Sequence, residues 1–413
     1  MSIVCNALLA LVLCALPALA QDWSRRQSAS WPQWLGPDRN GISPETGLFG
    51  DKPSFEESWR VHAGPGFSGL SVVGNRIYTM YTHSGDEYAV CLDARNGEVI
   101  WRTRTDRNLP ERQGGDGPRA TPTVADGMVY VSSAYGKLYA LDSQTGSQQW
   151  SRDLAREFGS KRPRWGFCPS PLVAGDLVLI EAGGTGGHSL IAFDKISGDV
   201  AWKTGRDKLG YSSPITATIG QTRQAVFFTG NGLIAVAPQH GQVLWKHPWT
   251  TSHDVNAATP VFIPPNRFFI SSGYGTGSTV VEVSATDRGY SVKEIWRNKK
   301  MKNHFATSIY YQGHLYGFDG SILKCLDAET GSEKWKTRGY GKGTLIVADG
   351  HLVILGEQGN LGLAEATPTG FVEKANTRVF RSKCWTVPTL ADGRLYLRDE
   401  SEIVCIDLAK VDQ

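Results

Sequence analysis

Seven positions in this chain, one in each successive stretch of about 40–50 residues, carry side chains that could together bind a small ligand. Each stands at or just before a segment that we expect to be an inner strand, and they are Arg119, Cys168, Tyr211, Asn256, His304, Lys342 and Trp385. Four further candidates lie near them in the sequence, namely Trp165, His253, Asp254 and Lys383. Aromatic faces with a few convergent polar groups are what small-molecule pockets use. These residues predict a ligand site at one mouth of a central channel; the alternative is that they bond only to loop backbone and water.

Acid–base chemistry is the second use that these residues suggest. A general base could be built from His253, Asp254 and His304, because a carboxylate beside an imidazole orients the ring. Each histidine taken alone is more often structural than catalytic, so we assign no catalytic residue. We also expect no metal site, since the chain has no Cys-x-x-Cys pair and no zinc-type spacing.

A tryptophan repeat predicts the framework that would position these side chains. Clear copies such as YALDSQTGSQQW recur, and the expected outer-strand tryptophans are Trp59, Trp101, Trp150, Trp202, Trp245, Trp296 and Trp335. A further copy carries Phe380 in place of tryptophan. Such a period is typical of a propeller or a solenoid. We expect each tryptophan to fill the gap against the neighbouring repeat.

Each repeat can be divided into four short strands separated by turns. In one copy the strands begin at Ala120, Met128 and Lys137, and the fourth surrounds Trp150. The Asp-x-x-Thr-Gly element before that tryptophan is a turn, in which Asp bonds to the backbone and Gly supplies a positive φ. Two glycine-rich segments, GGTGG from Gly183 and GYGTGS from Gly273, do not lead into a helical pattern as a phosphate-binding loop does, so we interpret them as turns.

The two ends of the repeat array complete one another. Trp59 has no strands of its own before it, and the segment from Trp385 to Leu408 has three strands and no tryptophan after it. Joining them closes a ring and removes exposed sheet edges. The sequence therefore predicts an all-β, eight-bladed β-propeller from about Ser54 to Leu408; a pair of β-sandwiches does not explain the period.

The N-terminal segment predicts export. Ile3 to Leu16 is apolar and is followed by Ala18-Leu19-Ala20, a pattern that precedes signal cleavage. We expect residues 1–20 to be a signal peptide cleaved after Ala20, residues 21–53 an extended strap, and residues 54–413 the propeller. The two strap tryptophans, Trp31 and Trp34, should pack on the propeller. The expected location is the periplasm or the extracellular space. A membrane span is disfavoured because the apolar run is too short, and a lipid anchor on Cys14 because no small residue precedes it.

Composition and cysteine content narrow the class further. The net charge is +3 with no long basic run, so nucleic acid is not an expected partner. Cys91, Cys325 and Cys405 share a third-strand position and are interpreted as small buried hydrophobic residues. Cys168 and Cys384 stand at inner strands, and no two cysteines are adjacent in the chain. We expect a monomer.

The repeat allows a family resemblance to be stated. Ala140, Asp142, Thr145, Gly146 and Trp150 form an A-x-D-x-x-T-G-x-x-x-W element, which resembles the tryptophan-docking repeat of the pyrroloquinoline-quinone (PQQ) dehydrogenases and of BamB-type outer-membrane assembly factors. The strap WPQWLGPDRNG and segments such as GYSSPI and MKNHF are similar to exported PQQ-like repeat proteins of planctomycete-type bacteria. The resemblance covers the whole propeller and is specific for the superfamily, not for one activity.

A quinoprotein activity would require more than the repeat. The resemblance implies a quinone held between a tryptophan and a disulfide of adjacent cysteines, a calcium ion held by Glu and Asn, and an Asp base. This chain has no Cys-Cys pair, and no Glu, Asn or Asp can be placed in a matching motif. We therefore expect no cofactor, and keep PQQ with calcium as the alternative.

Three functions remain open. The first is an exported, non-enzymatic propeller that binds a protein or a small ligand. The second is a PQQ-dependent alcohol or sugar dehydrogenase with a divergent site. The third is a scaffold in envelope assembly, similar to BamB.

Overall fold

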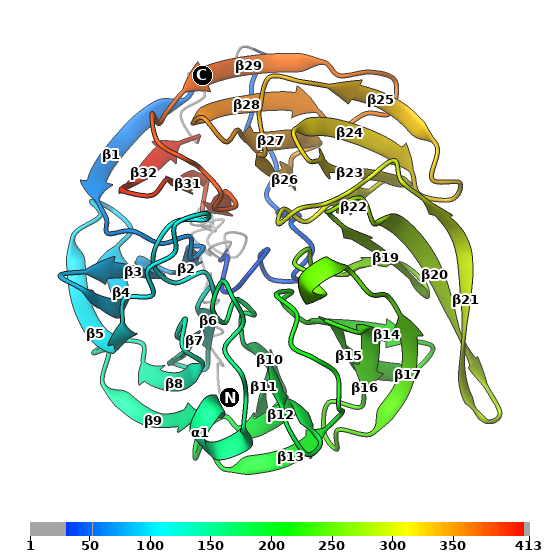
Figure 1. Ribbon diagram of the computed structural model, residues 1–413. Coiled ribbons are helices and arrows are strands. Elements are labelled where there is room, and N and C mark those ends of the chain that lie inside the picture. Colours follow the sequence, from blue (N-terminus) through cyan, green and yellow to red (C-terminus); the bar gives the residue numbers. More distant parts are fainter. Residues whose placement is uncertain (1–29, 52, 409–413) are drawn as a thin grey trace, which may run out of the picture.

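The fold is a closed ring of eight four-stranded antiparallel sheets around a central axis (Figure 1). The computed structural model describes residues 30–51 and 53–408, and the expected signal peptide at residues 1–20 lies outside them. The predicted eight-bladed β-propeller is confirmed. Within the described residues the helical elements are one short helix, α1 (Leu154–Phe158), and one 3-10 turn, η1 (Ser252–Asp254). None of these described helices is long and apolar enough to cross a membrane.

Blades 1 to 4 follow in chain order, each running from its inner to its outer strand. Their strands are β2 (Ser71–Val73), β3 (Arg76–His83), β4 (Asp86–Asp93) and β5 (Val99–Arg107); β6 (Thr123–Ala125), β7 (Met128–Ser132), β8 (Lys137–Asp142) and β9 (Gln148–Asp153); β10 (Leu172–Ala174), β11 (Leu177–Gly184), β12 (His188–Asp194) and β13 (Val200–Thr204); and β14 (Ile215–Ile219), β15 (Thr222–Thr229), β16 (Gly232–Val236) and β17 (Val243–Pro248).

Blades 5 to 7 continue the ring in the same way. Their strands are β18 (Val261–Ile263), β19 (Arg267–Ser272), β20 (Gly277–Thr286) and β21 (Gly289–Asn298); β22 (Ile309–Tyr311), β23 (His314–Asp319), β24 (Ile322–Asp327) and β25 (Glu333–Thr337); and β26 (Thr344–Ala348), β27 (His351–Leu355), β28 (Asn360–Glu365) and β29 (Glu373–Arg378). Blade 8 combines β30 (Thr389–Ala391), β31 (Arg394–Arg398) and β32 (Glu402–Asp407) with β1 (Glu56–His62).

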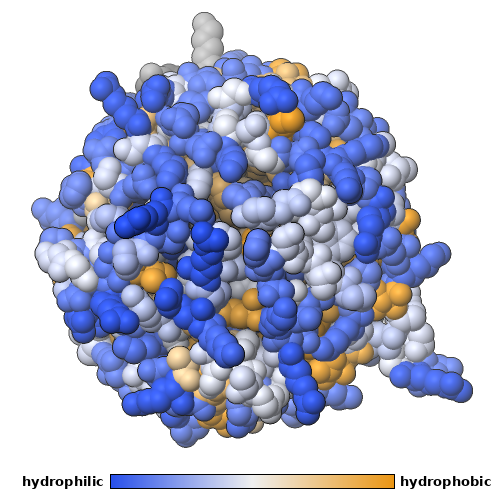
Figure 2. All heavy atoms as spheres, in the orientation of Figure 1, coloured by the Kyte–Doolittle hydropathy of each residue, from blue (hydrophilic) through white to orange (hydrophobic). Residues whose placement is uncertain are grey.

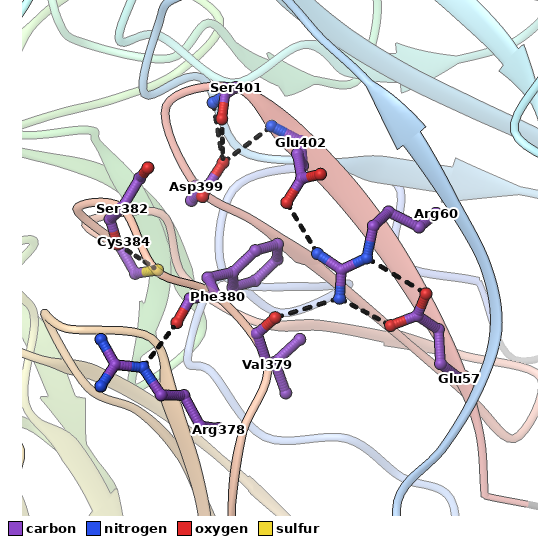
Figure 3. Close-up of polar contacts among 10 residues, drawn as sticks. All are labelled: Glu57, Arg60, Arg378, Val379, Phe380, Ser382, Cys384, Asp399, Ser401 and Glu402. Atoms are coloured by element: carbon purple, nitrogen blue, oxygen red, sulfur yellow. Dashed lines mark hydrogen bonds and ion pairs between the residues drawn. The ribbon is translucent and has the colours of Figure 1, made fainter.

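The predicted closure is present in blade 8. Strand β1 pairs antiparallel with β32, and Trp59 lies opposite Cys405. Figure 3 shows the seam with blade 7, where Arg60 donates hydrogen bonds to Glu402 and to the Val379 carbonyl. The fully buried Arg398 joins the other side of blade 8 to blade 1 by donating to the carbonyls of Ser68 and Met80 and to Thr79 Oγ1. A buried charge needs such a set of acceptors to be tolerated.

The tryptophan repeat forms a contact between neighbouring blades. Trp101 Nε1 donates to the Ser143 carbonyl of blade 2, and Trp150 Nε1 donates to the Lys195 carbonyl of blade 3, each at 3.1 Å. The turn glycine of the next blade lies flat against the indole, since a Cβ on Gly198 would be 2.6 Å from Trp150. The same carbonyl contact is made by Trp59, Trp202, Trp296 and Trp335. Each indole is thus held by the turn of the following repeat.

Trp245 departs from this pattern. Its Nε1 donates to Gln224 Oε1 of its own blade. The next blade has no Asp-x-x-Thr-Gly turn, because β20 and β21 continue as one hairpin that pairs as far as Thr286 and Gly289. The hairpin projects from the disc in Figure 1.

The interpretation of Phe380 as the blade 7 counterpart of the tryptophans is wrong. In the other blades the tryptophan lies just after a register shift, as when Cys325 faces Trp335. In blade 7 the same position is Ala375, opposite Leu363, and Phe380 lies beyond the end of β29. Blade 8 takes its outer strand from the N-terminal part of the chain, so no turn joins its third and fourth strands and a tryptophan would have no glycine to contact.

The strap crosses the channel and bonds to the inner strands of blades that lie far apart in the sequence. Trp31 exchanges two 2.8 Å hydrogen bonds with Val72 of blade 1, and Gly41 and Ser43 bond to Val347 of blade 7. Arg39 is buried between them and donates to the carbonyls of Pro214 and Pro171. Trp31 is 2% exposed and Trp34 is half-buried, which confirms that both pack on the propeller.

Candidate binding cavity

A cavity of about 360 Å³ lies at one mouth of the central channel. The loops that enter the inner strands supply most of its walls, and Trp34 of the strap contributes from the channel side. Its lining residues are Trp34, Phe67, Gln113, Gly114, Arg119, Trp165, Cys168, Ser170, Tyr211, Ser213, Val255, Ala257, Tyr274, His304, Phe305, Lys342 and Trp385. Figure 2 shows this face, on which hydrophilic side chains surround a hollowed and more apolar centre.

One wall of the cavity is a continuous row of five rings. Phe67 contacts Trp385 with ring centroids 5.4 Å apart, and Trp385 contacts Phe305 at 4.7 Å. The row continues from Phe305 to His304 at 5.7 Å and to Tyr274 at 5.2 Å. Four blades contribute to this row, so the rings are fixed by the closed ring of sheets. Such a wall offers apolar area for the face of a flat ligand.

The opposite wall is formed by blades 3 and 4. Trp165 and Tyr211 make an edge contact at 5.5 Å, and the Cys168 thiol donates to the carbonyls of Trp165 and Gly166. Burial raises the pKa of Cys168 to about 11, and burial also raises the pKa of Tyr211 above its ordinary value. Both groups are therefore neutral at pH 7, and the thiol is not a nucleophile there.

Two cationic side chains line the cavity, and they differ in how they are held. Arg119 donates to the carbonyls of Gly117 and Gly115 at 2.9 and 2.8 Å, and Glu111 lies 4.0 Å away. The ammonium group of Lys342 makes no ion pair or hydrogen bond with any described residue, and its backbone N–H donates to Glu357. None of the described residues that line the cavity is Asp or Glu. The cavity therefore favours an anionic ligand.

Glu357 lies behind the aromatic row and positions Trp385 and Lys342. Its Oε1 accepts a 3.0 Å hydrogen bond from Trp385 Nε1, and its Oε2 accepts the Lys342 backbone N–H at 3.1 Å. The carboxylate thus fixes the indole and the loop that carries the lysine.

His304 is neutral in this environment. Burial lowers its pKa, the nearby charge of Lys342 lowers it further, and Glu357 acts in the opposite direction. Its Nε2 lies 3.1 Å from the Tyr274 hydroxyl, whereas its Nδ1 is buried without a partner among the described residues.

The structure brings together part of the predicted site. Seven of the residues predicted from the sequence line the cavity, namely Arg119, Trp165, Cys168, Tyr211, His304, Lys342 and Trp385. Lys383 does not line it but lies over Trp385, with its ammonium 4.6 Å from the ring centroid. The ammonium is also 3.5 Å from Glu400, so Lys383 interacts with both the carboxylate and the indole.

The remaining candidates lie elsewhere. Asn256 is fully buried, and its amide donates to the carbonyls of Thr229 and Trp249, which fixes the loop before β18. His253 and Asp254 belong to η1 and do not line the cavity. The Asp254 carboxylate lies 3.2 Å from Lys208 Nζ. The three residues considered for a general base are therefore not gathered around one space.

Several lining residues were not predicted from the sequence. Phe305 directly follows His304 and carried the same positional signal. Tyr274 lies in the turn between β19 and β20, which the sequence identified only as a turn. Phe67 and Trp34 could be found only by knowing that the strap crosses the channel and that the loop before β2 reaches the mouth.

The residues present do not fit PQQ with calcium in the way that the resemblance implies. The five cysteines of the described chain are free, so no disulfide of adjacent cysteines can hold a quinone. Among the described residues no three His, Cys, Asp or Glu side chains gather as a metal site. We derive no reaction step through this cofactor.

Comparison with known proteins assigns the chain to a family. The sequence matches the family described as outer membrane protein assembly factor BamB over residues 51–157 and 85–337. These ranges cover more than half of the chain, and the chain belongs to this family of PQQ-like repeat propellers.

The individual relatives are of two kinds, BamB proteins and quinoprotein dehydrogenases. BamB of Shewanella oneidensis is 23% identical over 317 residues, which cover 72% of this chain and 70% of that protein. BamB of Burkholderia pseudomallei is 23% identical over 355 residues, which cover 74% and 87%. The quinoprotein alcohol dehydrogenase PedH of Pseudomonas putida is 30% identical over 146 residues, which cover 33% of this chain and only 24% of that enzyme.

Solved structures show the same fold. BamB from Moraxella catarrhalis has a TM-score of 0.61 at 13% identity and covers 87% of this chain and 99% of its own. The quinohemoprotein alcohol dehydrogenase ADHIIG from Pseudomonas putida HK5 has a TM-score of 0.65 at 13% identity and covers 93% and 81%. At these identities the likeness supports the fold alone.

Proposed function

We propose that this protein is an exported, non-enzymatic binding propeller whose mouth cavity takes a small anionic ligand with a flat ring. The observation that carries the proposal is the lining of the cavity, in which seven aromatic residues and two cations surround a space without a carboxylate among the described lining residues. Aromatic area favours a flat ligand face, and the cations favour negative charge. Export is supported by the apolar segment at residues 3–16 and by relatives whose names refer to the outer membrane.

A PQQ-dependent dehydrogenase is the less favoured alternative. It is supported by the fold and by the partial match to PedH, but the stacking disulfide and the calcium ligands that it needs are not supplied by the described residues. PQQ is itself a flat, acidic molecule, so it remains a suitable probe of the cavity even without turnover.

An assembly scaffold that binds a protein is the second candidate function. The long matches to BamB proteins favour it, because they extend over about three quarters of this chain. The two functions differ in where they would act: the scaffold needs an exposed protein surface, whereas ligand binding needs the cavity.

Ligand binding can be tested by fluorescence titration, because Trp34, Trp165 and Trp385 line the cavity. We expect naphthoate and PQQ to quench tryptophan emission with saturation, and Trp385→Ala to weaken both. Ile196→Ala is the matched control, since Ile196 is 63% exposed and lies in the turn between β12 and β13. Absence of saturable quenching by either acid at millimolar concentration would contradict the proposal.

A further inference from the structure

Lys342 is the cation of the cavity lining whose charged group makes no hydrogen bond or ion pair with the described residues. The Lys342 residue is half-buried and its ammonium has no acid or carbonyl partner among the described residues, whereas Arg119 in the same cavity donates to two carbonyls. The charge of Lys342 reaches the imidazole of His304, whose pKa it lowers. A cation that no protein group neutralises attracts a ligand of opposite charge.

Tyr274 lines the same cavity and can supply a second donor, and His304 sets the direction of its proton. The buried Nδ1 has no partner among the described residues, and an orphaned buried N–H is rarer in proteins than an unsatisfied acceptor. We therefore assign the neutral tautomer with the proton on Nε2. The Nε2–H then donates to the Tyr274 oxygen at 3.1 Å, which leaves the phenolic O–H free to donate to another group.

The backbone holds Tyr274 in place at the rim. Its φ is +53°, in the left-handed region that non-glycine residues seldom adopt, and its side chain is 50% exposed. Gly273 brings this turn directly onto His304, because a Cβ there would lie 3.3 Å from the His304 Cα. A non-glycine residue in this conformation costs about 1–3 kcal/mol and persists only where the surrounding structure holds it.

We propose that the Lys342 ammonium and the Tyr274 hydroxyl form an anion subsite that binds the carboxylate of a ring-bearing acid, whose flat face packs on Trp385 and Phe305. His304 is a positioning residue that acts through Tyr274. The groups that face His304 are Tyr274 from the β19–β20 turn, Lys342 from the loop before β26, and Glu357 from the turn between β27 and β28. This inference rests on the proposed function and names the chemistry of its ligand.

The test compares naphthoate with naphthamide, which has the same ring without the charge. We expect the intact protein to bind naphthoate at least ten-fold tighter, a difference of about 1.4 kcal/mol, because hydrogen bonds to a charged group are stronger than those to a neutral one. Lys342→Met should abolish this preference and Tyr274→Phe should reduce it, while naphthamide affinity stays within about two-fold. Lys299→Met is the control, because Lys299 is exposed and lies outside the cavity lining.

The role of His304 needs its own variants. His304→Ala should reduce the preference for the acid as much as Tyr274→Phe does, and should add nothing to it in the double variant. His304→Gln, whose amide can still donate to the Tyr274 oxygen, should restore part of the preference.

The outcomes separate the two proposals. If both probes bind but the preference for the acid is unchanged in Lys342→Met and Tyr274→Phe, the anion subsite is wrong and the binding function stands. If neither probe binds the intact protein, both proposals fail. Thermal melts of each variant show whether a loss of binding reflects unfolding, and Lys342→Arg, which keeps the charge, should retain the preference if the subsite is correct.

Discussion

The contact between each docking tryptophan and the next blade can be tested at Trp150. This side chain is 8% exposed, packs on Gly198 and donates a 3.1 Å hydrogen bond to the Lys195 carbonyl. Truncating a buried tryptophan to alanine costs about 3–5 kcal/mol. The lost hydrogen bond leaves a carbonyl with one partner fewer, so we expect Trp150→Ala to lie in the upper half of that range.

The opposite side of the same contact offers a matched pair of glycine substitutions. Gly198 and Gly175 have φ values of +72° and +65°, so an alanine pays a similar backbone penalty of about 1–2 kcal/mol at either position. A Cβ at Gly198 would meet Trp150 at 2.6 Å, whereas a Cβ at Gly175 has nothing within 4 Å. Overpacking adds about 1–3 kcal/mol, so Gly198→Ala should be more destabilising than Gly175→Ala by that amount.

The assay for both sides is urea unfolding followed by circular dichroism, which does not depend on the mutated tryptophan for its signal. A loss below about 1 kcal/mol for Trp150→Ala would mean that the indole does not hold the blades together. Equal losses for Gly198→Ala and Gly175→Ala would show that the turn does not press on the indole as the structure has it.

Three further predictions follow from the closure, the buried carboxyls and the missing cofactor ligands. Deleting all residues after Asp392 removes β31 and β32, the two middle strands of blade 8, so the truncated protein should fail to fold; a full melting temperature would contradict ring closure. Burial raises the pKa of Glu87 to about 7, whereas a glutamate in the unfolded chain has a pKa of about 4.3. The protonated carboxyl therefore stabilises the fold fully below about pH 4.3, and this contribution to the free energy of unfolding is lost as the pH rises to about 7. Glu87→Gln should therefore melt higher than the natural protein at pH 8, and by less at pH 5, unlike the exposed control Glu98→Gln; a pH-independent difference would refute this reasoning. After incubation with PQQ and calcium we expect no dye-linked oxidation of simple alcohols or aldose sugars, because a loosely held quinone loses orders of magnitude in rate; turnover that requires both PQQ and calcium would overturn this expectation.

The repeat made the framework predictable from the sequence. The turn Asp142 accepts bonds from the backbone of Gln144 and Thr145, and Gly146 adopts a positive φ, so the motif has a local cause that sequence can show. The orphan strand at Trp59 and the three strands before Leu408 predicted the seam correctly. The sequence did not show that Ala375 takes the tryptophan position in blade 7. The turn that would contact a tryptophan there is missing because blade 8 closes the ring with β1, and this depends on the whole fold.

The site was predicted in part, for a geometric reason. Loops that enter inner strands converge at one mouth, so alignment of the repeats identified Arg119, Tyr211 and His304 as neighbours in space. Alignment cannot tell which side of a loop faces the channel, and Asn256 turned out to be buried in loop hydrogen bonds. Tyr274 reaches the cavity from the turn between β19 and β20, a position that alignment of the repeats does not single out.

The most direct test of the binding function is a crystal structure of the protein with naphthoate. We predict density for the ligand in the mouth cavity, with its ring against Trp385 and Phe305 and its carboxylate near Lys342 and Tyr274. A saturated crystal with this cavity empty, or with the acid bound only elsewhere on the propeller, would contradict the proposed function.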